Sequence, residues 1–101
     1  MATNQSKPER SGFYYNLGAA YYALGQLESA LESYDEAVRI NPEYHEAYHN
    51  RGNVYHDLSQ STRAIEDYDQ AIQRNPEYSA AYNNRGIAYY DLGEHWRAIN
   101  D

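Results

Sequence analysis

Cysteine is absent from the 101-residue chain. Without thiols the protein can form neither a disulfide nor a thiolate metal site, so nothing in it requires an oxidising compartment. Long apolar runs are absent too, and a transmembrane helix needs about 20 consecutive apolar residues. The first ten residues, MATNQSKPER, are polar and lack the apolar stretch of a signal peptide. We therefore predict a cytoplasmic location.

Positive charge is scarce. Eight Lys and Arg residues stand against 15 Asp and Glu residues, which gives a formal net charge of -7. Nucleic-acid binding needs clustered Lys and Arg to contact phosphates, and anionic membranes attract the same residues. The charge balance therefore argues against nucleic acid and membrane surfaces as partners.

Aromatic residues are present mainly as tyrosine, with 13 Tyr against one Phe and one Trp. The Tyr positions follow an internal repeat of 34 residues. The segment Asn-Pro-Glu-Tyr occurs at 41–44 and again at 75–78. Other matches at this period are Tyr14, Tyr48 and Tyr82; Gly18, Gly52 and Gly86; Tyr21, Tyr55 and Tyr89; Ala30, Ala64 and Ala98. A fixed period of this length indicates a repeat architecture.

Each unit has the pattern of two helices. Apolar residues recur in steps of three and four over 14–24 and again over 27–38, and Gly25 separates the two stretches. Asn41-Pro42 ends the second, because proline cannot continue a helix. We predict an all-α fold divided into a polar lead-in (1–10), two complete units (11–44 and 45–78) and a truncated third unit (79–101). The predicted core is Tyr14, Leu17, Tyr21, Leu24, Ala30, Tyr34, Ala37 and their equivalents.

Glycine stands in the middle of the first predicted helix of every unit, where it costs about 1 kcal/mol relative to alanine. We therefore expect a close approach of the second helix at Gly18, Gly52 and Gly86, with Ala30, Ala64 and Ala98 as the facing positions. Replacing Gly52 with Leu should overpack the hairpin by about 1–3 kcal/mol.

These positions resemble the tetratricopeptide repeat (TPR) family, whose 34-residue unit has the pattern W-x2-L-G-x2-Y, A-x3-F and P. The first unit matches it with Tyr14, Leu17, Gly18, Tyr21, Ala30, Tyr34 and Pro42, and the second with Tyr48, Gly52, Tyr55, Ala64, Tyr68 and Pro76. The departures are Tyr in place of Trp or Phe, and Arg51 and Arg85 in place of Leu. The Asn-Arg-Gly triplets at 50–52 and 84–86 resemble bacterial arrays of the family. The resemblance covers residues 11–101 and implies a right-handed α-solenoid.

The resemblance also implies a concave groove, lined by the first helix of each hairpin, that holds a peptide of another protein. Helical geometry places one set of side chains on that inner face. The predicted groove residues are Tyr15, Ala19, Tyr22, Glu46, His49, Asn53, His56, Asp57, Asn83, Ile87, Tyr90 and Asp91. Tyrosine offers large contact area at small entropic cost, and asparagine can bind peptide amides. We therefore predict a protein–protein interaction scaffold.

Some family members clamp the carboxylates of acidic chaperone tails with Lys, Asn and Arg. The equivalent positions in this chain are Tyr15, Ala19, Asn50, Ala80 and Asn84. Only Asn50 fits, and Glu46, Asp57 and Asp91 would repel an acidic tail. We expect a basic or neutral partner.

Two alternatives remain open from the sequence. The truncated third unit leads us to expect a fragment of a longer array; the alternative is that its uncapped C-terminal end, near Trp96 and Ile99, stacks on another copy of the chain. His45, His49 and His56 could form a metal-binding face, since histidines four apart on a helix can chelate an ion.

An enzyme is not predicted, and no cofactor is implied. The sequence offers no nucleophile beside a base and no isolated carboxylate pair. Acidic residues of the second helices, Asp35, Glu36, Asp67 and Asp69, are expected to be solvated, with some of them pairing with Arg51 or Arg85.

Overall fold

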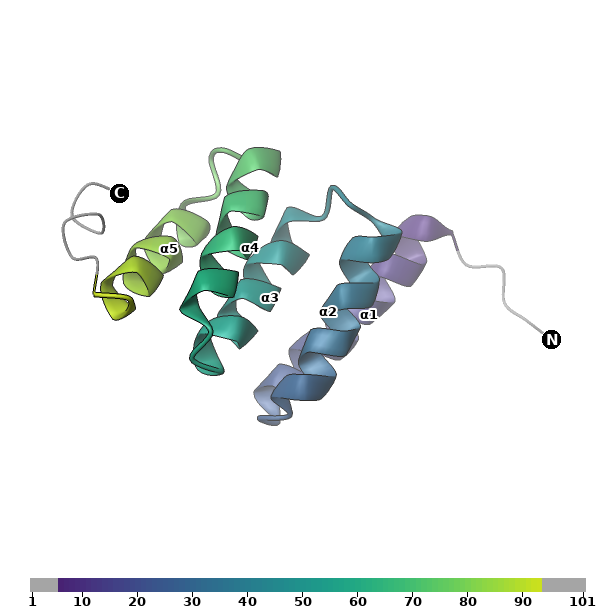
Figure 1. Ribbon diagram of the computed structural model, residues 1–101. Helices are drawn as coiled ribbons and strands as arrows, with labels where there is room; N and C mark the ends of the chain where they lie inside the picture. Colours follow the sequence, from purple (N-terminus) through teal and green to yellow (C-terminus); the bar gives the residue numbers. More distant parts are fainter. Residues whose placement is uncertain (1–5, 94–101) are drawn as a thin grey trace.

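The computed structural model describes residues 6–93, and this part of the chain is a row of five α-helices without strands. The helices are α1 (Lys7–Ala23), α2 (Leu27–Ile40), α3 (His45–Asp57), α4 (Ser61–Arg74) and α5 (Ser79–Asp91). They follow one another along the row in chain order (Figure 1). The prediction of an all-α solenoid of helical hairpins is confirmed. Within these residues no helix is long and apolar enough to cross a membrane.

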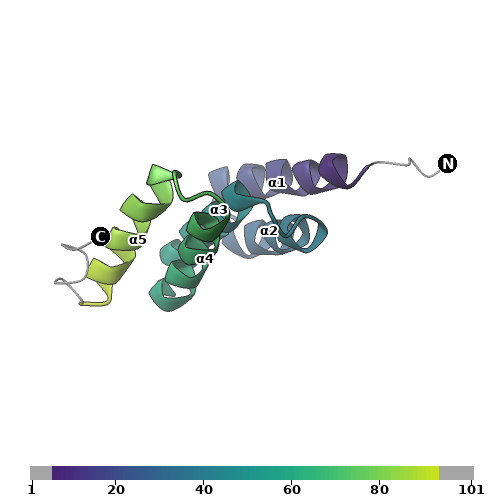
Figure 2. The same cartoon turned by 90° about the horizontal axis from the view of Figure 1, so that it is seen from above.

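Consecutive helices pair into hairpins, α1 with α2 and α3 with α4, while α5 packs against α4. Among the first helices, α3 also contacts both α1 and α5 directly. Seen from above, the hairpins turn progressively, so that α1 and α5 are inclined to each other (Figure 2). Because the first helices are neighbours, side chains on their shared face can meet although they lie a whole repeat apart in sequence.

The second helix of each complete hairpin ends at the Asn-Pro-Glu-Tyr segment, as the sequence predicts. The side chain of Asn41 accepts a hydrogen bond from the backbone N–H of Glu43 at 3.1 Å, and Asn75 accepts one from Glu77 at 3.2 Å. This Asx turn reverses the chain in a few residues. The next first helix therefore starts beside the preceding hairpin.

Each first helix is followed, two positions after its last residue, by a residue with positive φ. Gly25 has φ of 75° and Gly93 has φ of 79°, which glycine adopts without steric cost. Ser59 occupies the equivalent position in the second unit with φ of 62°. The middle unit therefore holds a side chain in a conformation that favours glycine.

Helix α1 begins earlier than the repeat predicts. It starts at Lys7, so residues 7–10, which the sequence assigns to the lead-in, are helical. The side chain of Ser6 caps the helix by accepting a hydrogen bond from the backbone N–H of Glu9. The carboxylate of Glu9 in turn accepts a hydrogen bond from the backbone N–H of Ser6. This is the capping box, and Pro8 lies in the first turn, where a helix tolerates it.

The glycines of the first helices face tyrosine rings. A Cβ added to Gly18 would lie 2.7 Å from the ring of Tyr34, and one added to Gly52 would lie 2.7 Å from the ring of Tyr68. Both rings are 1% exposed. The predicted close approach is present at these two glycines, but its nearest group is the tyrosine of the second helix rather than the expected Ala30 or Ala64. Ala98, the position expected to face Gly86, lies outside the described part of the chain.

The rest of the predicted core is only partly correct. The alanines and tyrosines of α2 and α4 are buried, including Ala30, Tyr34, Ala37, Ala64, Tyr68 and Ala71. Tyr14, Leu17 and Tyr21 are half-buried. Leu24 is 70% exposed, so its assignment to the core is wrong. It lies at the outer end of the first hairpin, where no further helix of the described chain covers it.

A buried ion pair replaces the leucine of the family pattern in the second unit. Arg51 donates to both carboxylate oxygens of Asp67 at 2.9 and 2.8 Å, and to Asp35 of the preceding hairpin at 3.0 Å. Arg85 contacts Asp69 in the same way at 2.8 Å. The predicted pairing of acidic residues with these arginines is confirmed. The prediction of a solvated side chain is wrong for Asp67, which is 4% exposed.

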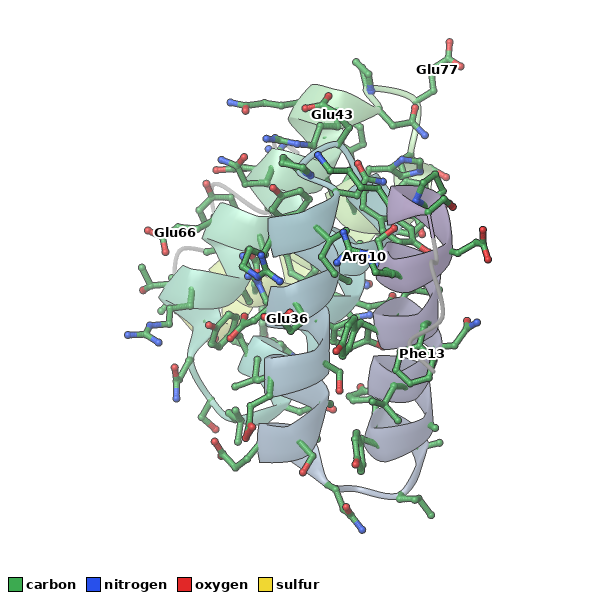
Figure 3. The ribbon with its side chains drawn as sticks, turned by 90° about the vertical axis from the view of Figure 1, so that its right-hand side faces the viewer. Arg10, Phe13, Glu36, Glu43, Glu66 and Glu77 are labelled. Carbon is green, nitrogen blue, oxygen red and sulfur yellow. The ribbon has the colours of Figure 1, made fainter. Side chains whose placement is uncertain are left out.

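The face of a first helix that points toward the preceding hairpin is buried in α3 but exposed in α1. On α3, Ala47 and Val54 are fully buried among residues of the preceding hairpin. On α1 the equivalent positions are Phe13, which is 52% exposed, and Ala20, which is exposed. Figure 3 views this outer face of the hairpin α1–α2, with Phe13 on α1 and Arg10 near the boundary between the two helices.

Candidate functional site

The inner face of the first helices is ordered by contacts 35 residues apart. A residue of one first helix therefore meets the residue 35 positions later, on the next first helix, which is one position more than the repeat period of 34. Four such pairs form hydrogen bonds or ion pairs: Tyr15 with Asn50, Tyr22 with Asp57, His49 with Asn84, and His56 with Asp91. They make two rows across α1, α3 and α5.

The first row forms a seam between the helices. Asn50 donates to the hydroxyl of Tyr15 at 3.1 Å and to that of Tyr34 at 3.4 Å. His49 lies 2.9 Å from the amide nitrogen of Asn84 through Nε2 and 3.2 Å from Asn50 Oδ1 through Nδ1. A neutral imidazole with its proton on Nδ1 satisfies both contacts, because it accepts on one side and donates on the other.

His49 is part of this seam rather than of the open groove surface. The side chain is 7% exposed and lies against the ring of Tyr78, with 5.1 Å between centroids, and against Tyr68 at 5.8 Å. Burial lowers the pKa of His49 below its ordinary value, and the nearby His45 acts in the same direction. The imidazole therefore favours the neutral form that its hydrogen bonds require.

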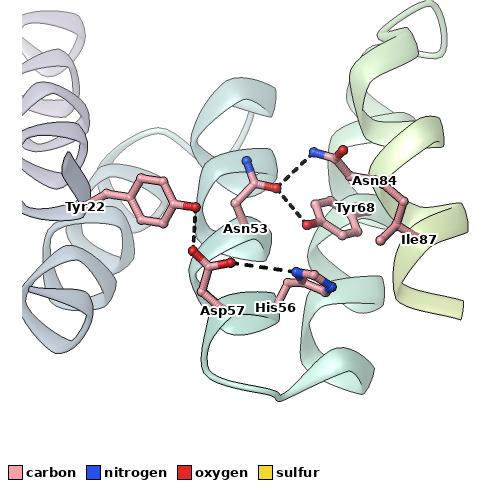
Figure 4. Close-up of a pocket in the computed structure, with 7 residues that line it drawn as sticks. All are labelled: Tyr22, Asn53, His56, Asp57, Tyr68, Asn84 and Ile87. Carbon is pink, nitrogen blue, oxygen red and sulfur yellow. Dashed lines mark hydrogen bonds and ion pairs between the residues drawn. The ribbon is translucent and has the colours of Figure 1, made fainter. Parts of the chain in front are cut away.

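The second row borders a pocket of about 270 Å³ on the inner face (Figure 4). Tyr22 donates to Asp57 at 2.6 Å, and His56 Nε2 lies 2.5 Å from Asp91. At the back of the pocket, the amide oxygen of Asn53 accepts hydrogen bonds from other helices. The lining residues are Tyr22, Asn53, His56, Asp57, Tyr68, Asn84 and Ile87.

The hydroxyls in the pocket are held protonated. The hydrogen bond to Asp57 raises the pKa of Tyr22 to about 12, and burial and the negative charge of Asp57 add to this. Burial raises the pKa of Tyr68 as well, and its hydroxyl donates to Asn53 at 2.7 Å. At neutral pH the pocket therefore combines hydroxyl donors with the carboxylate of Asp57, and none of its lining residues is Lys or Arg.

The structure distributes the predicted groove residues over several places. Five of them line the pocket: Tyr22, Asn53, His56, Asp57 and Ile87. Ala19, Asn83, Tyr90 and Asp91 are exposed around it, and Glu46 is half-buried. Tyr15 and His49 belong to the seam, where the ring of Tyr15 also stacks on Tyr44 at 5.0 Å.

Two pocket residues are missing from the sequence prediction. Asn84 was considered only as a position of the chaperone-tail clamp, although it lies 35 residues after His49 and follows the contact rule. Tyr68 belongs to the second helix α4 and was assigned to the core. Its long side chain passes Gly52 and brings the hydroxyl to Asn53, so the ring is buried while the hydroxyl lines the pocket.

The three candidate metal ligands have separate partners. His45 contacts the amide of Asn75 at 3.2 Å, His49 lies in the seam, and His56 contacts Asp91. Within residues 6–93 no group of three His, Asp or Glu side chains is arranged to hold a metal ion. The residues proposed for C-terminal stacking, Trp96 and Ile99, lie outside the described part of the chain.

Comparison with solved structures finds helical arrays of the same kind. The crystal structure of MamA aligns with a TM-score of 0.87 at 30% identity, over 89% of this chain and 53% of MamA. The TPR domain of Arabidopsis OM64 aligns with a TM-score of 0.90 at 27% identity, over 92% and 77% of the two chains. The first TPR of Spaghetti (RPAP3), solved with the HSP90 peptide SRMEEVD, aligns with a TM-score of 0.86 at 25% identity, over 88% and 71%.

The chain thus spans about half the length of MamA. No curated protein sequence matches it significantly. The family profile described as TPR repeat matches residues 18–59 and 52–93, which together include both complete hairpins except the start of α1 and continue through α5. The 34-residue period, the paired helices and this match agree, and the chain belongs to the tetratricopeptide repeat family.

Proposed function

We propose that the chain is a protein–protein interaction module that holds a peptide segment of its partner in the groove of α1, α3 and α5. The pocket of Figure 4 carries this proposal, since side chains of four helices, α1, α3, α4 and α5, converge on it. Concave sites with a few convergent polar groups are the usual binding sites of folded proteins. The RPAP3 array, which has the same fold, was solved with a peptide bound.

The charge of the groove favours a basic segment over an acidic one. The RPAP3 peptide SRMEEVD is acidic, whereas this groove has neither Lys nor Arg at the five clamp positions named above. Asn50, the one clamp residue present, already donates to Tyr15 and Tyr34. The carboxylates of Asp57 and Asp91 are 43% and 44% exposed, so they are accessible to a cationic side chain.

A Lys or Arg side chain of the partner would therefore bind between Asp57 and Asp91, with its aliphatic stem against Ile87. Ile87 is 46% exposed and Tyr90 58%, so apolar contact area is available beside the carboxylates. A hydrogen bond to a charged group contributes about 1.5–3 kcal/mol. Because both carboxylates are half-exposed, we expect the lower end of this range.

Binding can be measured by fluorescence anisotropy with three labelled seven-residue peptides of the same apolar content. One peptide carries three lysines, one carries three glutamates, and the third is SRMEEVD. We expect the lysine peptide to bind most tightly and its affinity to fall as salt is raised. Equal affinity for all three peptides, or preference for SRMEEVD, would contradict the proposed charge preference.

Charge-removing variants locate the site. Asp57→Asn and Asp91→Asn keep the shape of the side chains and should each weaken binding of the lysine peptide by about 10- to 15-fold. Glu77→Gln, an exposed carboxylate in the turn before α5, is the matched control and should change nothing. Tyr15 and His49 are unsuitable for this test, because their removal would disturb the seam between the hairpins.

A further inference from the structure

The outer face of α1 carries an apolar stripe that no described helix covers. Phe13, Leu17, Ala20 and Leu24 recur in steps of four, three and four, the spacing of a helix–helix seam. Phe13 is 52% exposed and Leu24 is 70% exposed. On α3 the same positions include Ala47 and Val54, which the preceding hairpin buries completely. The array itself thus indicates that this face of a first helix is suited to packing against another helix.

We propose that this stripe is the interface of a homodimer, in which α1 packs antiparallel against α1 of a second copy. With a two-fold axis near Leu17, Leu17 meets its own equivalent, and Phe13 lies opposite the partner's Ala20. A large side chain then faces a small one on both sides of the axis. A contact of this kind is isologous, so each complementary pair occurs twice.

The groove beside the stripe provides room for Phe13. Its volume is about 290 Å³, and its lining residues are Tyr14, Leu17, Tyr21, Ser29, Glu32, Ser33 and Glu36. Phe13 lies at its edge, because its ring packs edge-to-face on Tyr14 with 5.2 Å between centroids. The face shown in Figure 3 therefore carries both a protruding ring and a hollow. A self-complementary surface favours a second copy over an unrelated helix.

The charges on this face point to the same orientation. Lys7, Arg10 and Arg39 lie toward the N-terminal end of α1, where they outnumber Glu9 and Glu36, and Arg39 binds Glu36 at 2.7 Å. Glu28 and Glu32 lie on the first half of α2, beside the C-terminal end of α1. An antiparallel arrangement brings the basic end of each copy to the acidic end of the other. A parallel arrangement would bring like charges together, which costs free energy.

The 101-residue chain can be tested by sedimentation equilibrium between micromolar and millimolar concentration. We expect a monomer–dimer equilibrium. Phe13→Ala should raise the dimer dissociation constant by about a hundredfold, since each of two equivalent rings contributes about tenfold. Alanine occupies the equivalent positions 47 and 81, so the hairpin should tolerate it, and circular dichroism checks that the helix content is unchanged.

The matched control is at the opposite end of the array. Leu92 is 44% exposed at the end of α5, and Leu92→Ser should leave the dimer intact. A wild-type chain that stays monomeric at millimolar concentration would overturn the proposal. So would a dimer that survives Phe13→Ala but is lost in Leu92→Ser, since that outcome would place the contact at the C-terminal end.

The absence of native cysteine allows a direct test of the antiparallel pairing. Leu17→Cys places one thiol near the two-fold axis in each copy, within the reach that a disulfide needs. We expect mild oxidation to give a covalent dimer with Leu17→Cys and mainly monomer with Leu92→Cys. The reverse pattern would exclude the pairing through α1.

Discussion

The first and second hairpins have the same helical pattern but carry different residues at one pair of facing positions, one on each helix. In the first hairpin these residues are Leu17 on α1 and Ser33 on α2. In the second hairpin these positions hold Arg51 and Asp67, which form a buried ion pair. Arg51 also reaches Asp35 of the first hairpin. The comparison indicates that a hairpin does not need such an ion pair to form, since α1 and α2 pair without it, and that Arg51 links the two hairpins through Asp35.

The largest effect is expected when only one partner of this pair is removed. Arg51→Leu copies the first hairpin at one position but leaves Asp67 buried and unpaired. Breaking a buried ion pair in this way costs about 3–5 kcal/mol. Urea denaturation followed by circular dichroism measures the loss in free energy of unfolding.

The double variant Arg51→Leu/Asp67→Ser is the matched control, because it copies the first hairpin at both positions. It should recover most of the lost free energy, since no unpaired charge remains buried. If the double variant is as unstable as Arg51→Leu, the buried charge is not the cause of the loss.

A second comparison concerns the glycines. Gly52→Leu should lower the free energy of unfolding by about 1–3 kcal/mol through overpacking against Tyr68. Among the described residues, nothing lies within 4 Å of a Cβ added to Gly12, which lies inside α1. Gly12→Ala should therefore stabilise α1 by about 0.5–1 kcal/mol. Thermal unfolding of the two variants should show shifts of opposite sign, and two equal losses would contradict this account.

The start of α1 differs from the start of α3, which has no side-chain cap. Ser6→Ala removes the capping box and should cost about 1 kcal/mol. Glu43→Ala is the control, because Glu43 follows a proline, as Glu9 does, but lies in a turn. Chemical denaturation should show a loss for the first variant and almost none for the second.

The left-handed residue at the end of α3 offers a smaller gain. Ser59→Gly gives the second hairpin the residue that the first has at Gly25. Relief of the positive φ should raise the free energy of unfolding by about 0.5–1 kcal/mol. A thermal melt would detect this, and Gly25→Ser should produce a loss of similar size.

The smallest effect is a dependence on pH at the seam. The pKa of His49 is lower in the folded protein than in the unfolded chain, so the unfolded chain binds more protons in the interval between the two values. The contribution of His49 is therefore complete above a pH of about 6.5 and decreases as the pH falls below it. Melting temperatures at pH 7.5 and 5.5 should differ more in the wild type than in His49→Gln. An equal difference in both would exclude this histidine as a source of the pH dependence.

The sequence was sufficient to predict the hairpins and their order. The period of 34, the steps of three and four, and the Asn-Pro-Glu-Tyr turns are local signals, and the helices follow them. The start of α1 was missed, because residues 7–10 are polar and show no apolar helical pattern. The signal that marks the start is the pair Ser6 and Glu9, which forms a capping box.

The candidate site was less predictable. Helical geometry places Tyr22 and Asp57 on the inner face, but it does not predict the hydrogen bond between them. That contact depends on how far each first helix is shifted along its axis relative to the next one. The burial of His49 depends on the same offset, which brings Asn84 opposite it and places Tyr78 against its ring. The role of Tyr68 depends on the length of its side chain, which a helical pattern does not report.

The contacts between hairpins have a consequence for how the array could grow. A copy of residues 45–78 inserted after position 78 would find partners for the polar contacts that join the hairpins. Its Arg would meet Asp69 as Arg51 meets Asp35, and its Asn and Asp would meet His49 and His56 as Asn84 and Asp91 do. Gene duplication could therefore lengthen this protein by whole units without any compensating substitution, and each added unit would extend the acidic surface of the groove.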